Sequence, residues 1–453
     1  MRIHFISIGG SIMHNLAIAL KLKGHDVSGS DDEIFEPAKT RLKENGILPD
    51  KIGWNAGRIS KDIDAIILGM HARTDNPELS HAQKLKLNIY SFPEYIYLNA
   101  KEKTRIAIAG SHGKTTITSM VMHVMRKCNF DFDYMVGALV KGFDQGLKLT
   151  EEAPFIVLEA DEYLSSPINM EPKFLWYKPQ IVLLSGIAWD HMNVFPSIEV
   201  YHEQFRKFIK SLPKNAVVVY YNGDKILSQL VNEFNHIDKI PYQMPSYRIE
   251  GNQFVIEVEK SEDVKLELFG SHNVLNTEGA KHICSQIGIS NSDFYEAIKD
   301  FKGAGKRLET IFENDNFIAF RDFAHAPSKV KATVDGMKDQ YPNRTLIGCL
   351  ELHTFSSLNA EFIPQYKNSM QKADYKFVYI NQEAVELKRM KLLTKAEVFD
   401  AFGDPDLQVF YDREELVNAV QIHPMLDSVL LMMSSGNFGG LNLDKFAKQM
   451  VKK

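Results

Sequence analysis

The sequence predicts an α/β protein of three domains, each built around a mostly parallel β-sheet. A short apolar strand, a glycine turn and an apolar helix follow one another at residues 2–22, and the same order recurs at residues 104–125. From about residue 318, strand-length apolar runs alternate with segments of helical periodicity. This alternation is typical of parallel sheets, because a helix supplies the crossover that parallel strands need. The predicted domains are residues 1–103, 104–308 and 309–453.

Size and charge exclude several classes of protein. The 453 residues allow two to four domains, and 44% hydrophobic with 25% charged residues is an ordinary globular composition. The net charge of −5 leaves no basic surplus for nucleic acid. The three cysteines have no zinc spacing, and no apolar run approaches the roughly 18 residues that span a bilayer. We expect a cytoplasmic protein with no nucleic-acid or membrane partner.

The N-terminal domain opens with a Rossmann-like pattern. A predicted strand at Arg2–Ile8 leads into a glycine turn and a helix, and a second strand leads into Gly29-Ser30-Asp31. In this fold a diphosphate binds at the first turn, and a polar group after the second strand meets a ribose or base. His14 stands where a third glycine could fall, so a purely structural βαβ unit is an equal alternative. The binding candidates are Gly9, Gly10, Ser11, Ser30, Asp31 and, in a polar loop that could instead be merely solvated, His71.

A nucleotide triphosphate site is predicted where the second strand–turn–helix unit bends. The strand Arg105–Ala109 runs into Gly110-Ser111-His112-Gly113, and Lys114 begins the helix. The N–H groups of such a turn cradle phosphates, the lysine contacts the β/γ-phosphates, and the hydroxyl of Thr115 or Thr116 can hold Mg²⁺. Ile108 replaces the first glycine of the standard pattern. A plain strand-to-helix turn with a threonine cap is therefore the alternative.

Two more strand ends of the central domain carry candidate ligands. The strand Phe155–Leu158 runs into Glu159-Ala-Asp-Glu162, where Glu159 is the best-placed carboxylate for Mg²⁺. The strand at 181–184 leads to His191, which is either structural or a ligand for a second metal or the transferred phosphate.

Further along, His272 and Asn276 lie at the start of a predicted helix and could read a base edge or serve as structural groups. Arg307 follows a glycine-bearing loop and is either a phosphate ligand or a linker residue.

The C-terminal domain reads as a second Rossmann-like unit with polar residues after its strands. Its predicted strands lie at 318–320, 346–350, 377–380, 409–410 and 429–432, and its predicted helices begin near 327 and span about 362–372 and 414–422. The carboxyl ends of parallel strands form a binding face, which makes Asp322, His325 and His353 candidates. Each of the three could also be structural.

Six motifs together resemble the Mur ligases, which are ATP-dependent amide-forming ligases of bacterial peptidoglycan biosynthesis. These motifs are Gly110-Ser-His-Gly-Lys-Thr-Thr116, Leu158-Glu-Ala-Asp-Glu162, Asp190-His-Met192, Gly270-Ser-His-Asn-Val-Leu-Asn276, Lys306-Arg-Leu-Glu309 and Asp322-Phe-Ala-His325. The resemblance covers essentially the whole chain. It implies an N-terminal domain for the UDP-sugar, a central P-loop ATPase domain and a C-terminal domain for the incoming amine. It also implies a monomer or weak homodimer.

The resemblance also implies a role for each candidate. Lys114 would bind the γ-phosphate, Thr115 and Glu159 would hold one Mg²⁺, and His191 with Glu159 would hold a second, so Lys114, Glu159 and His191 are the implied catalytic residues. His325 and His353 would face the acceptor. The implied ATP contacts are Gly110, Ser111, His112, Gly113, Lys114, Thr115, Thr116, His272, Asn276, Arg307 and Asp322.

Within the family the chain resembles the members that act on UDP-N-acetylmuramate. ATP would convert the lactyl carboxylate of this substrate into an acyl phosphate, which the acceptor amine attacks. Gly29-Ser-Asp31, Phe35-Glu-Pro37 and the ending Met433–Gly440 favour the recycled tripeptide L-alanyl-γ-D-glutamyl-meso-diaminopimelate as acceptor. The alternative acceptor is L-alanine, but Thr354 and Ser357 replace the arginines that bind its carboxylate in those members.

Two other classes fit part of the sequence. A nucleotide-dependent switch or motor would not need the N-terminal domain, and the guanine-specific Asn-Lys-x-Asp motif is absent. A nicotinamide-dependent oxidoreductase would use the Gly9-Gly10 turn but leaves the Lys114 loop unexplained.

Overall fold

The chain forms two compact units in the computed structural model. Unit 1 comprises Met1–Ile187, His202–Tyr242 and Gly279–Phe294, and unit 2 comprises Ala188–Tyr201, Gln243–Glu278 and Tyr295–Lys453. The structure describes residues 1–192, 194–251, 253–258, 262–268, 270–303, 305, 307–423 and 426–450. Lys306, which belongs to one of the six motifs, lies outside these residues. Boundaries between the units fall within helices α7 (Ile198–Ser211), α9 (Ser271–Gln286) and α10 (Asn291–Ile298).

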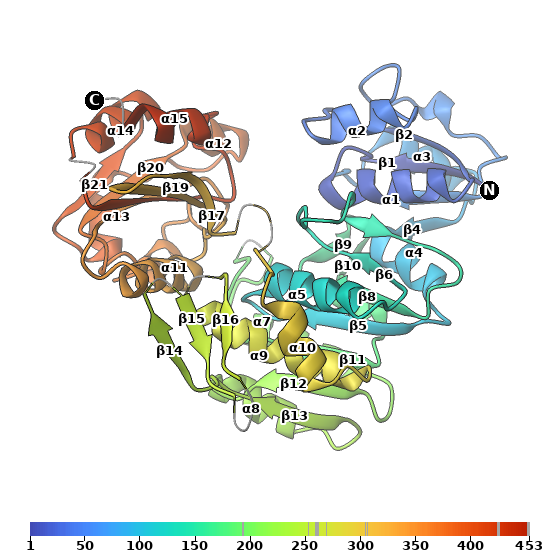
Figure 1. Cartoon of the computed structure of the whole chain (residues 1–453). Helices are drawn as coiled ribbons and strands as arrows, with labels where there is room; N and C mark the ends of the chain where they lie inside the picture. The colour runs from blue at the N-terminus through green and yellow to red at the C-terminus, as the bar shows by residue number, and fades with distance from the viewer. Residues whose placement is uncertain are drawn as a thin grey trace. The chain divides into compact units, whose positions relative to one another are not determined.

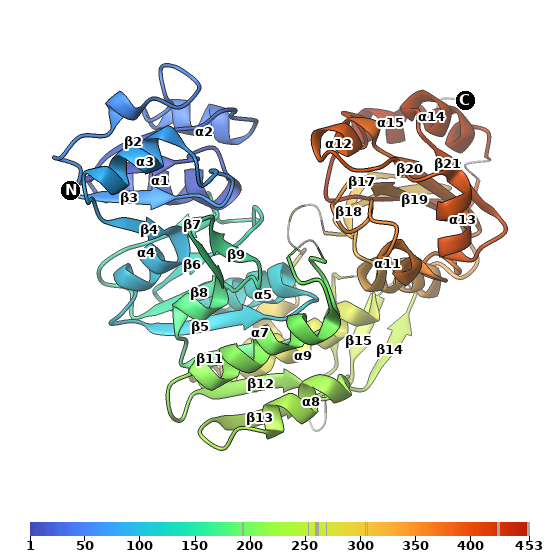
Figure 2. The ribbon, with the colours of Figure 1, turned by 180° about the vertical axis from the view of Figure 1, so that it is seen from behind.

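The first sheet of unit 1 is parallel and has the strand order β2-β1-β3-β4. Helices α1 and α3 cover opposite faces of this sheet (Figures 1 and 2), because right-handed crossovers leave its middle in opposite directions. The order reverses between β1 and β3, which makes the turn after β1 a topological switch point. The elements are β1 (Arg2–Ile6), α1 (Ser11–Leu22), β2 (Asp26–Ser30), α2 (Ala38–Glu44), the 3-10 helix η1 (Ala56–Arg58), β3 (Ala65–Leu68), α3 (Pro77–Lys84), β4 (Ile89–Ser91) and α4 (Phe92–Asn99).

The second sheet of unit 1 has seven strands in the order β13-β12-β11-β5-β8-β6-β7, and only β7 runs antiparallel to its neighbour. Strand β5 is central and apolar, and Ile106–Ala109 is fully buried, as expected for a parallel strand covered on both faces. The elements are β5 (Thr104–Ala109), α5 (Lys114–Lys127), β6 (Phe132–Met135), β7 (Leu147–Lys148), β8 (Phe155–Glu159), α6 (Phe174–Tyr177), β11 (Ile181–Leu184), β12 (Val217–Tyr221), α8 (Lys225–Asn232) and β13 (Asp238–Tyr242). A separate two-stranded ribbon joins β9 (Leu164–Ser166) to β10 (Asn169–Pro172).

Unit 2 contains a small antiparallel sheet and a larger six-stranded sheet. The small sheet joins β14 (Tyr247–Glu250), β15 (Gln253–Ile256) and β16 (Val264–Leu266). The large sheet has the order β17-β18-β22-β19-β20-β21 and is parallel except for β17. Its elements are β17 (Glu309–Glu313), β18 (Phe317–Asp322), α11 (Pro327–Gln340), β19 (Thr345–Leu352), η2 (Ile363–Tyr366), β20 (Tyr375–Ile380), α12 (Gln382–Leu387), α13 (Lys395–Phe402), β21 (Leu407–Phe410), α14 (Arg413–Gln421), β22 (Ser428–Met433) and α15 (Leu443–Met450).

Apolar side chains fill both faces of the large sheet of unit 2. One core cluster includes Val330 and Val334 of α11, and the other includes Leu416 of α14 and Phe446 of α15. Helix α11 therefore lies on one face, and α14 with α15 on the other (Figure 1).

The predicted α/β class with mostly parallel sheets is confirmed, and one predicted helix is wrong. The expected helix at 362–372 is only the short 3-10 helix η2 followed by turns. Pro364 has no N–H to donate, and Asn368 adopts a left-handed φ of 59°. The apolar spacing that suggested a helix arises because Phe362, Tyr366 and Met370 all pack into the core.

Candidate active site

The loop between β5 and α5 has the backbone of a phosphate-binding turn. Gly110 and Gly113 have φ values of 111° and 64°, in the region that favours glycine. A Cβ at Gly110 would lie 2.6 Å from Ser185 Oγ, so only glycine lets the loop lie this close to the end of β11. The N-terminus of α5, with its partial positive charge, opens on this loop. The seven predicted ATP contacts of unit 1, Gly110, Ser111, His112, Gly113, Lys114, Thr115 and Thr116, are contiguous here.

Lys114 forms a buried ion pair with Glu162. Its Nζ lies 2.8 Å from Glu162 Oε2 and 2.6 Å from the carbonyl oxygen of Gly110. The side chains of Lys114 and Glu162 are 14% and 1% exposed. Burial alone would lower the pKa of Lys114, but Glu162 and Asp161 raise it above its ordinary value. The loop therefore holds a charged ammonium group, as binding of a polyphosphate requires.

A hydroxyl and a carboxylate meet beside this loop in an arrangement that fits Mg²⁺. Thr115 Oγ1 donates to Glu159 Oε1 at 2.7 Å, and the N–H of Gly137 donates to Glu159 Oε2 at 2.7 Å. Hard oxygen ligands of this kind suit Mg²⁺ that also binds substrate phosphates. The residues of this unit thus fit the ion, which would neutralise phosphate charge.

The three acids at the end of β8 and just after it have different partners. Glu159 accepts a hydrogen bond from Thr115, and Glu162 forms an ion pair with Lys114. Asp161 Oδ2 lies 2.8 Å from Lys173 Nζ. Sequence reasoning ranked Glu162 below Glu159 as a metal ligand, because Glu159 directly follows the predicted strand and three neighbouring acids could instead form a solvated turn. The contact with Lys114 adds Glu162 to the candidate site.

The glycine turn after β1 is held by a hydrogen bond to the side chain of Asp31. Gly9 N–H donates to Asp31 Oδ2 at 2.7 Å. Burial raises the pKa of Asp31 to about 6, against the Gly9 hydrogen bond, which lowers it. Ser30 is buried and its hydroxyl donates to the buried Glu78.

Five of the predicted UDP-sugar residues, Gly9, Gly10, Ser11, Ser30 and Asp31, therefore lie at the switch point of the first sheet. The sixth, His71, is exposed and follows the neighbouring strand β3.

Asp322 organises the predicted nucleotide contacts of unit 2. It is buried at the end of β18 and accepts hydrogen bonds from Leu308 N at 2.8 Å and Thr333 Oγ1 at 3.0 Å. The bond to Leu308 fixes the chain next to Arg307, whose guanidinium lies 4.3 Å from the ring centroid of Phe323. The structure therefore brings Arg307 and Asp322 into one loop cluster.

His272 lies against α11 at the start of α9. Burial lowers the pKa of His272, and the carboxylate of Asp322 partly opposes this. Its Nδ1 is buried and has no hydrogen-bond partner in the described part of the chain. Asn276 Nδ2 donates to Asn273 Oδ1 at 3.1 Å. An imidazole nitrogen without a partner and a buried amide fit the recognition of a base edge.

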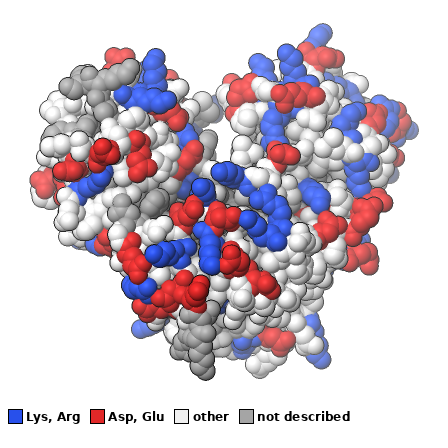
Figure 3. Space-filling view, viewed as in Figure 1, with Lys and Arg blue, Asp and Glu red and all other residues white. Residues whose placement is uncertain are grey.

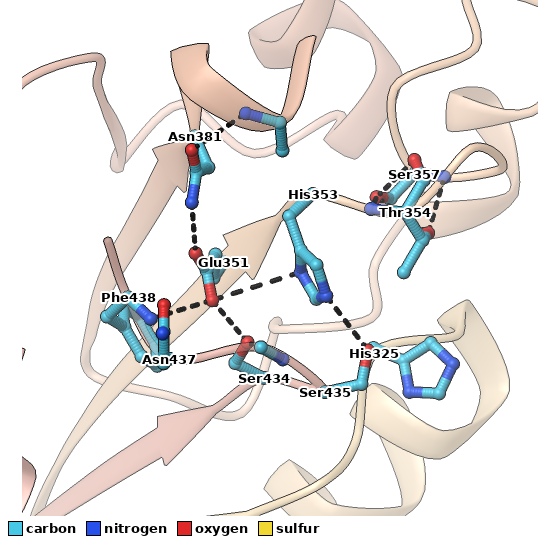
Figure 4. Close-up of polar contacts among 12 residues, drawn as sticks. His325, Glu351, His353, Thr354, Ser357, Asn381, Ser434, Ser435, Asn437 and Phe438 are labelled. Atoms are coloured by element: carbon cyan, nitrogen blue, oxygen red, sulfur yellow. Dashed lines mark hydrogen bonds and ion pairs between the residues drawn. The ribbon is translucent and has the colours of Figure 1, made fainter. Parts of the chain in front are cut away.

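A second polar cluster occupies the carboxyl ends of β19 and β22 (Figure 4). The buried carboxylate of Glu351 accepts from Asn381 Nδ2 and Phe438 N, each at 2.9 Å, and from the hydroxyl of Ser434. His353 Nδ1 lies 3.8 Å from Glu351 Oε2, and its Nε2 lies 3.1 Å from the hydroxyl of Ser435. The cluster thus links the polar loop after β22 to the predicted acceptor residue His353.

His325 lies beside this cluster (Figure 4). Its Nδ1 is 2.9 Å from the carbonyl oxygen of Phe323, so Nδ1 carries the proton and Nε2 keeps a lone pair. Burial and the charge of Lys329 lower the pKa of His325. At neutral pH this ring is therefore an uncharged hydrogen-bonding group.

Thr354 and Ser357 form hydrogen bonds with one another. Thr354 Oγ1 lies 2.9 Å from Ser357 Oγ, and the N–H of each residue donates to the other hydroxyl, at 3.0 and 3.1 Å. These two residues close a turn and offer no positive charge.

His191 belongs to unit 2, whereas Thr115 and Glu159 belong to unit 1. Its predicted role as a metal ligand with Glu159 stays a prediction. Within its own unit, the neighbouring Asp190 lies 3.0 Å from Lys329 Nζ.

Acidic and basic side chains of the described residues are interspersed on the face shown in Figure 3. The formal charge of −5 likewise provides no surplus of cations for a polyanion. Every helix of the described residues is too short or too polar to span a bilayer.

Three mostly parallel sheets, with a lysine-bearing glycine loop on the middle one, define a nucleotide-dependent α/β enzyme. Residues 2–104 match the family description "Mur ligase family, catalytic domain", and residues 108–284 match "Mur ligase middle domain". The UDP-N-acetylmuramate–L-alanine ligase of Caldicellulosiruptor bescii is 32% identical over 384 residues, which cover 82% of this chain and 81% of the relative. The chain belongs to the Mur ligase family and is an ATP-dependent ligase that forms a C–N bond.

A relative with a different acceptor aligns over almost the full length. The UDP-N-acetylmuramate–L-alanyl-γ-D-glutamyl-meso-2,6-diaminoheptanedioate ligase of Escherichia coli K12 is 26% identical over 467 residues, which cover 99% of both chains. Solved structures of a murein peptide ligase from Psychrobacter arcticus and a UDP-N-acetylmuramate–alanine ligase from Thermotoga maritima share the fold. Their identities are 22% and 21%, their TM-scores are 0.70 and 0.74, and each match covers 100% of this chain and 98% of the other.

Proposed function

We propose that this ligase joins the lactyl carboxylate of UDP-N-acetylmuramate to the amine of L-alanyl-γ-D-glutamyl-meso-diaminopimelate. The choice of this acceptor is based on the hydrogen bond between the hydroxyls of Thr354 and Ser357. By resemblance, L-alanine ligases place arginines at these positions to bind the carboxylate of the amino acid. Two hydroxyls that are hydrogen-bonded to one another cannot supply that charge, so these two positions give the carboxylate of free L-alanine no positive partner.

The loop after β22 supports a longer acceptor. Ser434, Ser435 and Asn437 bring hydroxyl and amide groups beside His353 (Figure 4), and neutral donors and acceptors of this kind suit a peptide backbone. The higher identity, 32%, of the Caldicellulosiruptor bescii L-alanine ligase instead supports L-alanine as the acceptor. It remains the second candidate.

The chemistry requires an activated carboxylate, because the negative charge of a carboxylate repels an attacking amine. Transfer of the ATP γ-phosphoryl group to the lactyl carboxylate gives an acyl phosphate, and attack by the peptide amine then releases phosphate. Lys114 neutralises charge on the transferred group, and Thr115 with Glu159 would hold Mg²⁺. His272 and Asn276 would bind the base, and Arg307 and Asp322 the phosphate and ribose.

The same proposal assigns one substrate chiefly to each predicted domain, with Asp322 of the last domain also contacting ATP. Residues 1–103 bind the UDP-sugar through the Gly9 turn, Ser30, Asp31 and His71. Residues 104–308 bind ATP, and residues 309–453 bind the acceptor through His325 and His353. The polar clusters at the strand ends support this division.

Phosphate release from ATP in the presence of Mg²⁺ and UDP-N-acetylmuramate tests the proposal. Release that depends on the tripeptide, with formation of the UDP-linked tripeptide product by mass spectrometry, supports it. Phosphate release that occurs with L-alanine but not with the tripeptide would identify the protein as an L-alanine ligase, the second candidate. Release that needs no UDP-sugar contradicts both.

A further inference from the structure

The segment that carries the Asp190-His191 motif is packed into unit 2. The ring of Trp189 lies edge-on to Phe362, with centroids 5.7 Å apart and an interplanar angle of 74°. Trp189 and Met192 both pack against the core cluster that contains α11. Trp189 Nε1 also donates to the carbonyl oxygen of Phe195 at 3.0 Å. Apolar contacts therefore fix the residues on each side of the Asp190-His191 pair.

His191 itself has an unusual backbone. Its φ of 56° lies in the left-handed region, which is uncommon for residues with a Cβ, although histidine enters it more readily than most. The N–H of His191 donates to Asp190 Oδ1 at 2.8 Å, and its carbonyl oxygen accepts from Val194 N and Phe195 N, each at 2.9 Å. A conformation of this kind persists only where the surroundings fix it.

Lys329 holds the other oxygen of Asp190. Its Nζ lies 3.0 Å from Asp190 Oδ2, and the two side chains are 21% and 8% exposed. The Lys329 ammonium and the N–H of His191 thus hold opposite oxygens of one carboxylate. Lys329 lies in the first turn of α11, far from Asp190 in the sequence.

We propose that Lys329 is a positioning residue whose ion pair with Asp190 holds His191 in its left-handed conformation and so aims the imidazole. The chain of contacts runs from Nζ of Lys329 to one carboxylate oxygen of Asp190, and from the other oxygen to the N–H of His191. Loss of the ammonium frees the carboxylate to turn toward solvent, and the backbone of His191 then relaxes. This inference rests on the proposed function, together with the role that the family resemblance implies for His191 as a ligand for a second Mg²⁺.

Lys329→Met tests this role, because methionine keeps most of the side-chain volume and removes the charge. Lys331→Met is the matched control on the same helix, since Lys331 is 55% exposed and its ion pair among the described residues is a local one, with Asp335 at 2.7 Å. We expect turnover of Lys329→Met to fall at least about 10-fold, with KM for ATP within about threefold of wild type. Lys329→Arg should retain most of the turnover, and Lys331→Met should match wild type.

A second readout does not depend on turnover. Carbethoxylation of His191 by diethyl pyrocarbonate, followed by peptide mass spectrometry without ATP or metal, reports the environment of the imidazole. Its rate should change several-fold in Lys329→Met but not in Lys331→Met. If Lys329→Met fails to fold, the uncharged pair Lys329→Met with Asp190→Asn is measured in its place, and the same changes are expected.

The His191→Ala background separates positioning from a merely structural effect. There, adding Lys329→Met should cause no further loss of turnover, because the residue through which it acts is absent. A further 10-fold loss in that background, or wild-type turnover and carbethoxylation in Lys329→Met alone, overturns the inference. A wild-type protein without UDP-sugar-dependent phosphate release would instead refute the proposed function, and the carbethoxylation rates would still decide the role of Lys329.

Discussion

At the scale of single residues, Lys114 and Glu162 depend on one another. Removing one partner of a buried ion pair leaves the other charge in a poorly solvated place, which costs about 3–5 kcal/mol. We expect Lys114→Met to lower turnover by roughly 100-fold or more, because charge on the transferred phosphoryl group loses its counterion. The same variant should lower the free energy of unfolding, measured with urea. The double variant Lys114→Met with Glu162→Gln should recover stability without recovering turnover.

Lys127→Met, at the exposed end of the same helix, is the control and should behave as wild type. Wild-type turnover in Lys114→Met would contradict the phosphate role. A double variant no more stable than the single one would contradict the pairing.

The carboxylate of Glu351 holds together the residues of the predicted acceptor site. It accepts hydrogen bonds from Asn381, Ser434 and Phe438, all of which are donors. Glu351→Gln places an amide NH₂ against one of these donors and leaves a buried group unsatisfied, at about 1–3 kcal/mol. We expect KM for the acceptor to rise about 10-fold while KM for ATP stays within about threefold, as steady-state kinetics would measure.

Glu361→Gln is the matched control, because Glu361 is exposed on the surface of the same unit. An unchanged acceptor KM in Glu351→Gln would remove the Ser434–Phe438 loop from the acceptor site.

At the scale of elements, α11 is placed by a glycine. A Cβ at Gly336 would lie 3.2 Å from Gly270 Cα, a contact with backbone that has little room to yield. Alanine is intrinsically better than glycine in a helix by about 1 kcal/mol, so an isolated helix would gain from Gly336→Ala. Here we expect the opposite, with lower stability and weaker ATP binding by calorimetry, because the added methyl pushes α11 away from the turn that carries His272.

Ser328→Ala, at an exposed position of α11, provides the comparison and should leave ATP binding unchanged. Tighter or equal ATP binding in Gly336→Ala would mean that the turn at Gly270 moves freely.

Elements with a strong local signal were predictable from the sequence. The glycine loop before Lys114 predicted both the preceding strand β5 and the following helix α5, because the steric and electrostatic requirements of such a loop involve only a few neighbouring residues. The segment 362–372 was misread because its apolar spacing reflects packing against the core rather than helical geometry.

At the scale of the whole molecule, the sequence predicted the three mostly parallel sheets and the family, but it did not predict which acids and histidines pair. The sequence ranked Glu159 above Asp161 and Glu162 as a ligand for Mg²⁺, but only the tertiary contacts assign each acid its partner. The ion pair between Asp190 and Lys329 joins residues 139 positions apart, a separation that no local pattern can bridge.

The partly buried histidines of unit 2 predict how stability depends on pH. Burial lowers the pKa of His272, His325 and His353. Below the ordinary histidine pKa of about 6.5, the unfolded chain binds protons that the folded chain does not, so stability is complete above that pH and falls as the solution is acidified. Each histidine contributes up to about 1.4 kcal/mol per pH unit over this window.

We therefore expect the urea midpoint of the wild type to be lower at pH 5.5 than at pH 7.5, and His325→Gln to reduce this difference. Asp31 acts in the opposite direction, because its raised pKa makes the folded state bind a proton more readily as the pH falls. The comparison between variants removes that contribution, since Asp31 is common to both. His71→Gln, at an exposed histidine, should keep the wild-type dependence. An equal dependence in His325→Gln and the wild type would mean that His325 becomes protonated without unfolding, which contradicts its assignment as a neutral hydrogen-bonding group beside the acceptor.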